Sequence, residues 1–231
     1  MTLLKIYQKF LRAYGPQGWW PTTRNGKTDY YGGPANEKER LEVCLGAILT
    51  QNTSWKNAGK ALRNLHRHSL IDAGKLARIK QNKLAEIIRS SGFHNQKAER
   101  LKIFCNHIQK NYNGSLKKLF AKDVDKLKKE LLGLKGIGPE TADSMMLYAA
   151  NKPVFVIDAY TKRIFSSLGY LGLKANYDEW QRLFHENLPT DAKLFNEYHA
   201  LIVEHGKRLG NGNAADLGRK ALYTADTNRY L

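Results

Sequence analysis

The sequence predicts an all-α fold. Apolar side chains recur every three or four residues in almost every stretch of the chain, which is the period of a helix with one buried face. Only residues 154–157 favour an extended conformation, and because Pro153 and Asp158 bound them closely we expect a buried connector rather than a strand. Glycine, proline and asparagine gather between the apolar stretches, where helices end.

The expected helices follow one another along nearly the whole chain. The first apolar stripe joins Leu3, Ile6 and Phe10, so the chain is expected to begin with a helix. Stripes of the same spacing cover residues 41–48, 84–88, 101–108, 142–149, 160–168, 180–184 and 195–202. After Gly210 the sequence turns polar and its periodicity weakens.

Residues 14–35 interrupt the helical pattern. They are rich in glycine, proline, asparagine and tyrosine, so we expect a long loop between the first two helices. Loops of this length in compact domains are usually functional or disordered. The aromatic residues Trp19, Trp20, Tyr30 and Tyr31 argue against disorder.

The charge balance predicts a polyanionic partner. The chain carries 38 lysines and arginines against 21 acidic residues, a net charge of +17 at pH 7. Nucleic acid is favoured over an anionic membrane, because no apolar stretch approaches the roughly 20 residues of a spanning helix; a merely soluble basic surface is the other interpretation. Cys44 and Cys105 lie in apolar stripes, which indicates reduced core thiols and a cytoplasmic protein.

Two closely spaced glycines form the strongest local signal. In the segment LLGLKGIGPETAD, Gly136 and Gly138 flank Ile137 between two expected helices, the second beginning near Pro139. Glycine allows the backbone to approach a ligand closely, and the free amides of a helix N-terminus suit a phosphate. An ordinary turn between helices is the alternative, and the positive charge of the chain favours phosphate binding.

Asp158 follows the apolar run VFVI at the start of another expected helix. A carboxylate there can cap the helix, whose positive end stabilises the ionised form. It can also stand as a fixed anion beside a developing sugar cation, or orient and deprotonate a water molecule. One side chain can serve both roles.

These two elements, in this order, resemble the helix-hairpin-helix, Gly/Pro-rich, Asp (HhH-GPD) superfamily of DNA glycosylases, which includes endonuclease III. Four blocks between about residues 41 and 209 carry the resemblance: LGAILTQNTSWKNAGKAL, SGFHNQKAERL, LLGLKGIGPETAD and FVIDAYTKRIF. It implies two helical lobes with a base-binding cleft between them. Residues 33–152 would form a central bundle, and residues 1–32 with 153–231 a second lobe that carries the catalytic aspartate, Asp158.

The resemblance also implies which residues contact DNA. Gln51 and Asn52 match the place where relatives insert a residue into the space that a flipped base leaves. Phe93 matches the wedge on the opposite strand, with core packing as the alternative. The residues that match the hairpin gripping the DNA backbone are Leu134, Lys135, Gly136, Ile137 and Gly138.

Two departures from endonuclease III indicate the subtype. Where bifunctional relatives place a nucleophilic lysine, this chain has Glu140, which cannot form a Schiff base. Water activated near Asp158 is therefore the expected nucleophile. Lys135 lies within the hairpin and is expected to contact a phosphate. Many relatives also carry four cysteines that hold an iron–sulfur cluster, and the matching segment VEHGKRLGNGNAADLGRKALY has none. We therefore expect no cluster and no other metal, apart from the family's possible monovalent cation at the hairpin.

The pair of tryptophans followed by Pro21 points to a branch of the superfamily. Together with LGAILTQNT, the segment WWP most resembles the 3-methyladenine glycosylases called MagIII. By that resemblance Trp20 and Trp55 sandwich the base, and their indole faces would attract a cationic alkylated purine. Trp19 is a neighbouring candidate. Lys207 matches a position near the base pocket, with an ordinary surface lysine as the alternative.

The sequence thus predicts a monofunctional DNA N-glycosylase of base excision repair that excises alkylated purines from damaged double-stranded DNA. The alternatives are a glycosylase for uracil or thymine opposite guanine, and a non-catalytic DNA-binding module. We expect a monomer, associated with the nucleoid and not with a membrane. The basic residues expected to rim the DNA groove are Lys97, Arg100, Lys102, Lys117, Lys118, Lys126, Lys128 and Lys129.

Overall fold

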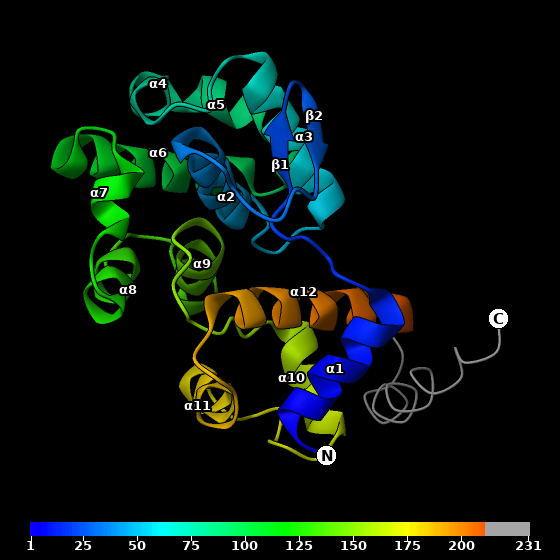
Figure 1. Cartoon of the computed structure of the whole chain (residues 1–231). Helices are drawn as coiled ribbons and strands as arrows, with labels where there is room; N and C mark the ends of the chain where they lie inside the picture. The colour runs from blue at the N-terminus through cyan, green and yellow to red at the C-terminus, as the bar shows by residue number, and fades with distance from the viewer. Residues whose placement is uncertain (211–231) are drawn as a thin grey trace. The chain divides into compact units, whose positions relative to one another are not determined.

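Helices make up most of the computed structural model, which describes residues 1–210, and the predicted all-α class is confirmed (Figure 1). The polar segment after Gly210, including most of the cysteine-free stretch noted above, lies outside the described residues. The helices are α1 (Leu3–Tyr14), α2 (Glu37–Leu49), α3 (Trp55–Arg67), α4 (Ala73–Arg78), α5 (Gln81–Ile87), α6 (His94–Tyr112), α7 (Leu116–Phe120), α8 (Val124–Leu132), α9 (Pro139–Ser144), α10 (Ala159–Ser167), α11 (Tyr177–Asn187) and α12 (Ala192–Leu209). Two shorter helical segments are the 3₁₀ turn η1 (Arg89–Ser91) and the π-helical segment η2 (Met145–Ala149), and the strands are β1 (Thr22–Arg24) and β2 (Lys27–Asp29).

The chain forms two compact units. Of the described residues, one unit contains 1–19 and 153–210, and the other is Trp20–Lys152. Residues 20–32 therefore belong with the central bundle rather than with the N-terminal helix. The reason is that β1 is bonded to carboxylates of α2, as described below.

In the first unit, α12 packs against both α1 and α10 (Figure 1). Gly206 permits the close approach to α10, because a Cβ atom there would overlap the ring of Tyr160. Residues 154–157 form the predicted buried extended connector. Its backbone is satisfied by side chains of α11, since Phe155 N donates to His185 Nε2 at 2.9 Å and Gln181 donates to Phe155 O at 2.7 Å.

In the second unit, α2 is surrounded by neighbours and is buried from Leu41 to Leu49. It packs against α3, α6 and η2. Cys44 and Cys105 are both free thiols in this core, and burial raises their pKa values. Their thiolates are therefore not available at neutral pH.

Part of the predicted loop is a β-hairpin. β1 and β2 pair antiparallel, with Arg24 opposite Lys27, and the two-residue turn consists of Asn25 and Gly26, both at positive φ. An Asn-Gly pair is the preferred sequence for such a turn. The expectation of an irregular loop was wrong here, because the flanking strands TTR and KTD are short and polar and show no apolar alternation.

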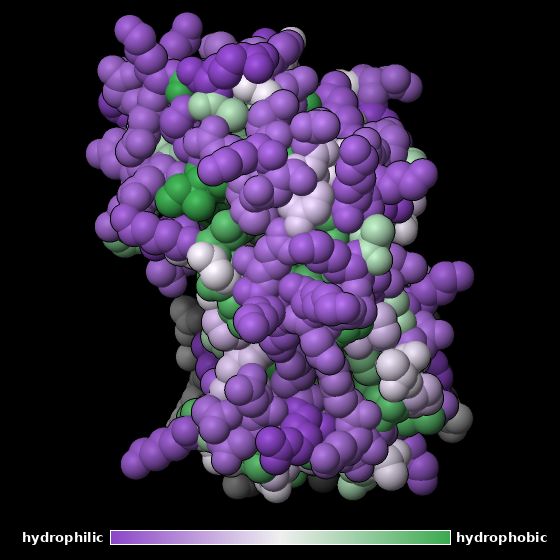
Figure 2. All heavy atoms as spheres, turned by 90° about the vertical axis from the view of Figure 1, so that its left-hand side faces the viewer, coloured by the Kyte–Doolittle hydropathy of each residue, from purple (hydrophilic) through white to green (hydrophobic). Residues whose placement is uncertain are grey.

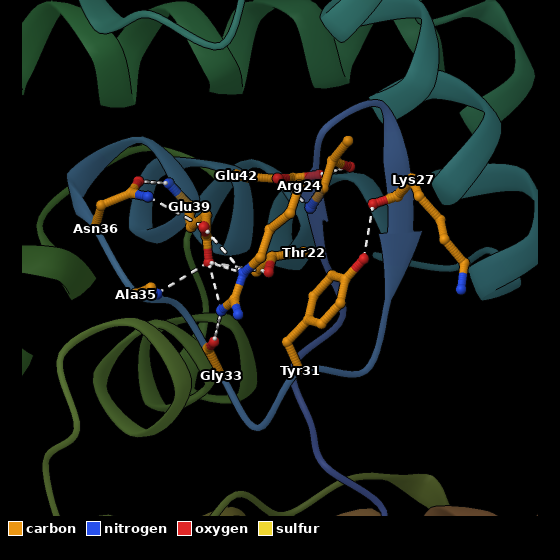
Figure 3. Close-up of polar contacts among 10 residues, drawn as sticks. Thr22, Arg24, Lys27, Tyr31, Gly33, Ala35, Asn36, Glu39 and Glu42 are labelled. Carbon is orange, nitrogen blue, oxygen red and sulfur yellow. Dashed lines mark hydrogen bonds and ion pairs between the residues drawn. The ribbon is translucent and has the colours of Figure 1, made fainter.

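Two buried carboxylates of α2 anchor this hairpin (Figure 3). Glu39 accepts hydrogen bonds from Thr22, Arg24, Ala35 and Asn36. Burial alone would raise the pKa of Glu39, but the bonds from Arg24, Ala35 and Thr22 outweigh it and lower the pKa. Glu42 accepts from the backbone N of Thr23 at 2.9 Å and from its hydroxyl at 2.6 Å.

One face of the molecule shows how polar side chains cover the helices. The face drawn in Figure 2 is covered mostly by hydrophilic side chains, with apolar residues in small, scattered groups. Among residues 1–210, every helix is too short or too polar to cross a membrane.

Candidate functional site

The hairpin between α8 and α9 has the geometry expected of a backbone-binding turn. Ile137 N donates to Leu134 O at 3.0 Å, and Gly136 adopts a φ of 88°. Gly138 is the N-cap of α9 with extended backbone, and Pro139 occupies the first turn. Ile137 is buried and secures the turn, while Gly138 and Pro139 are exposed at the start of the helix. Free amides at this helix start can receive an anion.

Gln51 ties the end of α2 to this turn. Its amide nitrogen donates to Gly136 O at 3.0 Å and to the Thr141 hydroxyl at 2.8 Å, and Arg100 donates to its carbonyl oxygen. The side chain is therefore engaged within the second unit rather than projecting into solvent. Asn52, the other candidate for insertion into DNA, is exposed at a φ of 52°.

Asp158 is the N-cap of α10, and its two carboxylate oxygens have different surroundings. Oδ1 accepts from the backbone N of Thr161 at 2.7 Å and from the Thr161 hydroxyl at 2.8 Å. Oδ2 lies 3.7 Å from Nε2 of His199, on α12. The carboxylate retains 14% exposure, so one of its oxygens is oriented by the cap while the group as a whole stays accessible.

His199 brings an imidazole against this carboxylate. It is buried, and that burial lowers its pKa even though Asp158 acts to raise it. The ring is therefore neutral at neutral pH, and within residues 1–210 no ion pair to a lysine or arginine compensates the negative charge of Asp158. An uncompensated anion is what a developing sugar cation requires.

Trp19 and Lys207 extend this cluster within the first unit. The Trp19 ring lies edge-on to His199, with 6.0 Å between ring centroids. The ammonium of Lys207, near the end of α12, lies 5.5 Å from the centroid of Trp19. Lys207 is thus more than an isolated surface lysine, because its charge faces an indole next to the Asp158 cluster.

Trp20 and Trp55 belong to a separate aromatic cluster in the second unit. Their ring centroids are 5.5 Å apart and their planes are 87° apart, and the Tyr148 ring lies 5.0 Å from Trp20. Two perpendicular rings in contact do not form the parallel walls that the expected sandwich requires. Trp20 is buried and Trp55 half-buried, so a base entering here would have to stack on Trp55 or turn one ring.

The observation that decides the family comes from comparison with known proteins. A model of the HhH-GPD superfamily of base excision DNA repair proteins matches residues 45–190, more than half of the chain, and includes both the hairpin and Asp158. The chain belongs to the HhH-GPD superfamily. The resemblance inferred from the four sequence blocks is confirmed.

Individual relatives agree with this membership. A Methanocaldococcus jannaschii protein provisionally named a DNA repair glycosylase is 46% identical over 209 residues, which cover 90% of this chain and 88% of the relative. The structure of H. pylori 3-methyladenine DNA glycosylase (MagIII) bound to 1,N6-ethenoadenine matches with a TM-score of 0.74 and 31% identity, covering 90% of this chain and 96% of that one. An endonuclease III–DNA complex matches with a TM-score of 0.73 over 95% of both chains, at 16% identity, which shows a shared fold alone.

Phe93 of this HhH-GPD protein is not a core residue. Its side chain is 64% exposed, at the N-cap of α6, with a φ of 44°. A bulky aromatic residue rarely adopts such a backbone conformation or points into water without a functional reason. The core alternative is therefore excluded, and the expected role as a wedge remains a proposal.

Several basic residues expected to rim a DNA groove are engaged elsewhere. Lys97 is buried and donates to Leu49 O and Ser91 O, and burial lowers its pKa to about 8. Lys102 likewise donates to the carbonyls of Ala77 and Ile79. The expectation for Lys97 was wrong: the lysine joins the end of α2 to the turn before α6. Arg100 holds Gln51, and Lys126 and Lys128 form ion pairs with Asp123 and Asp143.

Sequence reasoning missed two residues that the fold adds to these clusters. His199 stands 41 positions from Asp158, next to no motif. Tyr148 follows the hairpin segment directly, within η2, and its sequence position gave it no role of its own. A π-helical segment within a helix often marks a functional position, but its irregularity is not visible in the spacing of apolar residues. Among residues 1–210, the acidic, histidine and cysteine side chains form no group that could hold a metal ion.

Proposed function

We propose that this HhH-GPD protein is a monofunctional DNA glycosylase that releases alkylated purines of the 3-methyladenine type from double-stranded DNA. The observation that carries the proposal is that the two oxygens of the Asp158 carboxylate have different surroundings. Oδ1 of Asp158 is held twice by Thr161, and Oδ2 lies beside a neutral imidazole. An anion fixed in this way, with no lysine or arginine paired to it among residues 1–210, suits a reaction that develops positive charge on a sugar.

The proposed reaction is a hydrolysis. The bond between C1′ and the base nitrogen breaks, and its electron pair leaves with the base. Asp158 stabilises the positive charge that forms on the sugar and accepts a proton from the water whose oxygen bonds to C1′. An alkylated purine is already cationic and becomes neutral as it leaves, so little further help to the leaving group is needed.

The aromatic side chains support the choice of base. A cationic purine stacks favourably on an indole, and this chain offers Trp19 beside the Asp158 cluster and Trp55 on α3. The H. pylori relative, at 31% identity, is named as a 3-methyladenine glycosylase and is seen with a modified adenine bound. Extrusion of the target nucleotide from the duplex is required for any such contact.

The hairpin argues against strand cleavage. Glu140, in the first turn of α9, is a carboxylate and cannot form an imine with the sugar. Lys135 has an amine but is paired with Glu99 at 2.6 Å. We propose that the hairpin contacts backbone phosphates through its amides, that Lys135 exchanges Glu99 for a phosphate when DNA binds, and that the hairpin carbonyls can also bind a monovalent cation. Reduction with borohydride during turnover should therefore trap no protein–DNA adduct.

We also propose that the protein works without an iron–sulfur cluster. A four-iron cluster requires four cysteine ligands, and the whole chain has two. Both are buried in the core of the second unit, where burial raises their pKa values. Purified protein should lack cluster absorbance and should keep its activity after treatment with a chelator.

The test of the proposed function is base release from methylated duplex DNA, with the products separated by chromatography. We expect free methylated purine, and an abasic strand that breaks only after alkali. Release of uracil or thymine from mispaired duplexes, with no purine released, would replace this proposal by the pyrimidine alternative. Tight DNA binding without any released base would indicate a non-catalytic module.

A further inference from the structure

A basic cavity lies at the far end of α3 from Trp55. It has a volume of about 480 Å³ and is lined by Thr23, Asn25, Gly26, Lys38, Arg63, His66 and Arg67. No carboxylate belongs to this lining. Lys38 and His66 also line a second cavity of about 260 Å³, which reaches Lys75 and the α4 N-cap Asp72. The two cavities are therefore neighbours along one groove, here called the α3 groove.

The cations of the α3 groove lack acidic partners. Lys38, Arg63 and Arg67 are exposed, and none of the three forms an ion pair within residues 1–210. Other basic residues of the same unit are neutralised, for example Lys122 by Glu130 and Lys135 by Glu99. Three unpaired cations around one cavity repel one another, and an anion placed among them relieves that repulsion.

The wall of the groove is fixed before any ligand arrives. His66 Nε2 lies 2.8 Å from Glu42 Oε1, and the buried Glu42 also accepts hydrogen bonds from the backbone N and the hydroxyl of Thr23. This carboxylate sets both the imidazole and β1 in place. The turn at Asn25 and Gly26 follows directly, so the hairpin and the end of α3 present a single preformed surface.

We propose that the α3 groove binds backbone phosphates of the duplex DNA that flanks the lesion. DNA as the ligand rests on the proposed function above. Arg67 stands 12 residues after Trp55 on α3, which corresponds to about 18 Å along the helix axis. A duplex strand carries one phosphate per about 3.4 Å, so a length of about 18 Å equals the rise of about five base pairs, and we propose that the strand follows α3 over this length.

The extent of the groove favours a polymer over a small anion. The cations follow one another from Arg67 through Lys38 to Lys75, across two adjoining cavities. A single phosphate would leave most of that length empty. A strand passing along it places successive phosphates against successive cations, which is how proteins hold DNA without reading its sequence.

The test compares two double variants on duplexes of two lengths. Arg63→Gln with Arg67→Gln removes two charges from the groove, and Lys117→Gln with Lys118→Gln removes two exposed charges from α7 of the same unit. Dissociation constants are measured over a series of salt concentrations, on labelled duplexes with either three or fifteen base pairs on each side of an abasic analogue. Lys38→Gln, on α2, serves as a second groove variant.

We expect the groove double variant to bind the long duplex about tenfold more weakly and the short duplex as the unmodified protein does. Its plot of log affinity against log salt should be shallower by about 1.8 for the long duplex only, because about 0.9 is lost per phosphate contact. The α7 variant should respond equally on both lengths. Single-turnover base release at saturating enzyme should stay unchanged, which separates this site from the proposed catalytic function.

Equal losses on both duplex lengths for the groove and α7 variants would overturn the proposal. A second pair of results would also overturn it: pyrophosphate binds tightly and the groove substitutions abolish that binding, while DNA affinity does not depend on flank length. The ligand of the groove would then be a free phosphate compound. If the flank-length effect appears but the unmodified protein releases no base, the proposal that the groove binds DNA is supported and the proposed glycosylase function is wrong.

Discussion

His199 Nε2 lies 3.7 Å from Oδ2 of Asp158, and this contact between α12 and α10 is too long for a hydrogen bond. Because burial lowers the pKa of His199, the imidazole is neutral at neutral pH and does not cancel the charge of the carboxylate. The helix cap fixes the other oxygen through Thr161. The same aspartate therefore has a structural role at Oδ1, and the proposed chemistry requires its charge.

The substitution Asp158→Asn separates these two roles. Asparagine caps helices as well as aspartate, so the fold should be retained, while the loss of the anion should slow base release by at least about 100-fold. Single-turnover release from methylated duplex measures the rate, and binding of an abasic-site duplex should be unaffected. Asp191→Asn is the matched control, since Asp191 caps α12 in the same way outside this cluster. An active Asp158→Asn protein would remove the aspartate from the mechanism.

The substitution Phe93→Ala tests the exposed aromatic ring. Because the side chain is 64% exposed, its loss should change the stability of the fold by less than about 0.5 kcal/mol. If Phe93 is the proposed wedge, affinity for duplex containing a damaged base should fall several-fold, because the ring that would replace base stacking is lost. Denaturant unfolding and binding to matched damaged and intact duplexes measure the two quantities. A large loss of stability with unchanged binding would show that the ring supports the fold instead.

The helices were predictable because an amphipathic stripe needs only local spacing, and the hairpin glycines and Asp158 stand next to recognisable apolar runs. His199 was not predictable, because its place beside Asp158 depends on how α10 and α12 pack. Lys97 shows the opposite error. A lysine at this position is expected on a solvated face, and only the fold reveals the two carbonyl oxygens that accept hydrogen bonds from its ammonium group.

The substitution Gly136→Ala tests the hairpin turn. A Cβ atom at this position would stand 2.5 Å from Cγ of Arg100, and the φ of 88° is unfavourable for alanine. Because Arg100 also holds Gln51, its displacement should loosen the link between α2 and the turn. We expect a loss of stability of about 2 kcal/mol and weaker DNA binding.

Gly169→Ala is the matched control for that variant. Its φ of 81° is similar, and no atom lies within 4 Å of the added Cβ. It should therefore show the conformational cost alone, about 1 kcal/mol, with normal DNA binding. Thermal unfolding and binding to an abasic-site duplex measure both variants. Equal losses of stability and unaltered binding in both would mean that the contact between Gly136 and Arg100 has no importance.

Acid should destabilise the first unit through His205. Burial lowers the pKa of this histidine to about 4, and its ring stacks on Phe10 and bonds Tyr14. Between pH 6.5 and 4 the unfolded chain binds a proton at this residue that the folded chain does not. Stability is therefore full above pH 6.5 and falls as the pH drops, by about 3 kcal/mol in total from this residue.

The substitution His205→Phe should remove that part of the pH dependence. Phenylalanine keeps the stacking on Phe10 and loses the bond to Tyr14, so stability at pH 7 should fall by about 1 kcal/mol. The difference in stability between pH 7 and pH 4.5, measured by denaturant unfolding, should nevertheless become smaller than in the unmodified protein.

His199 contributes to the acid sensitivity in the same direction, because burial lowers its pKa too, so some acid sensitivity should remain in His205→Phe. If His205→Phe is as sensitive to acid as the unmodified protein, the buried ring is not the source of the effect.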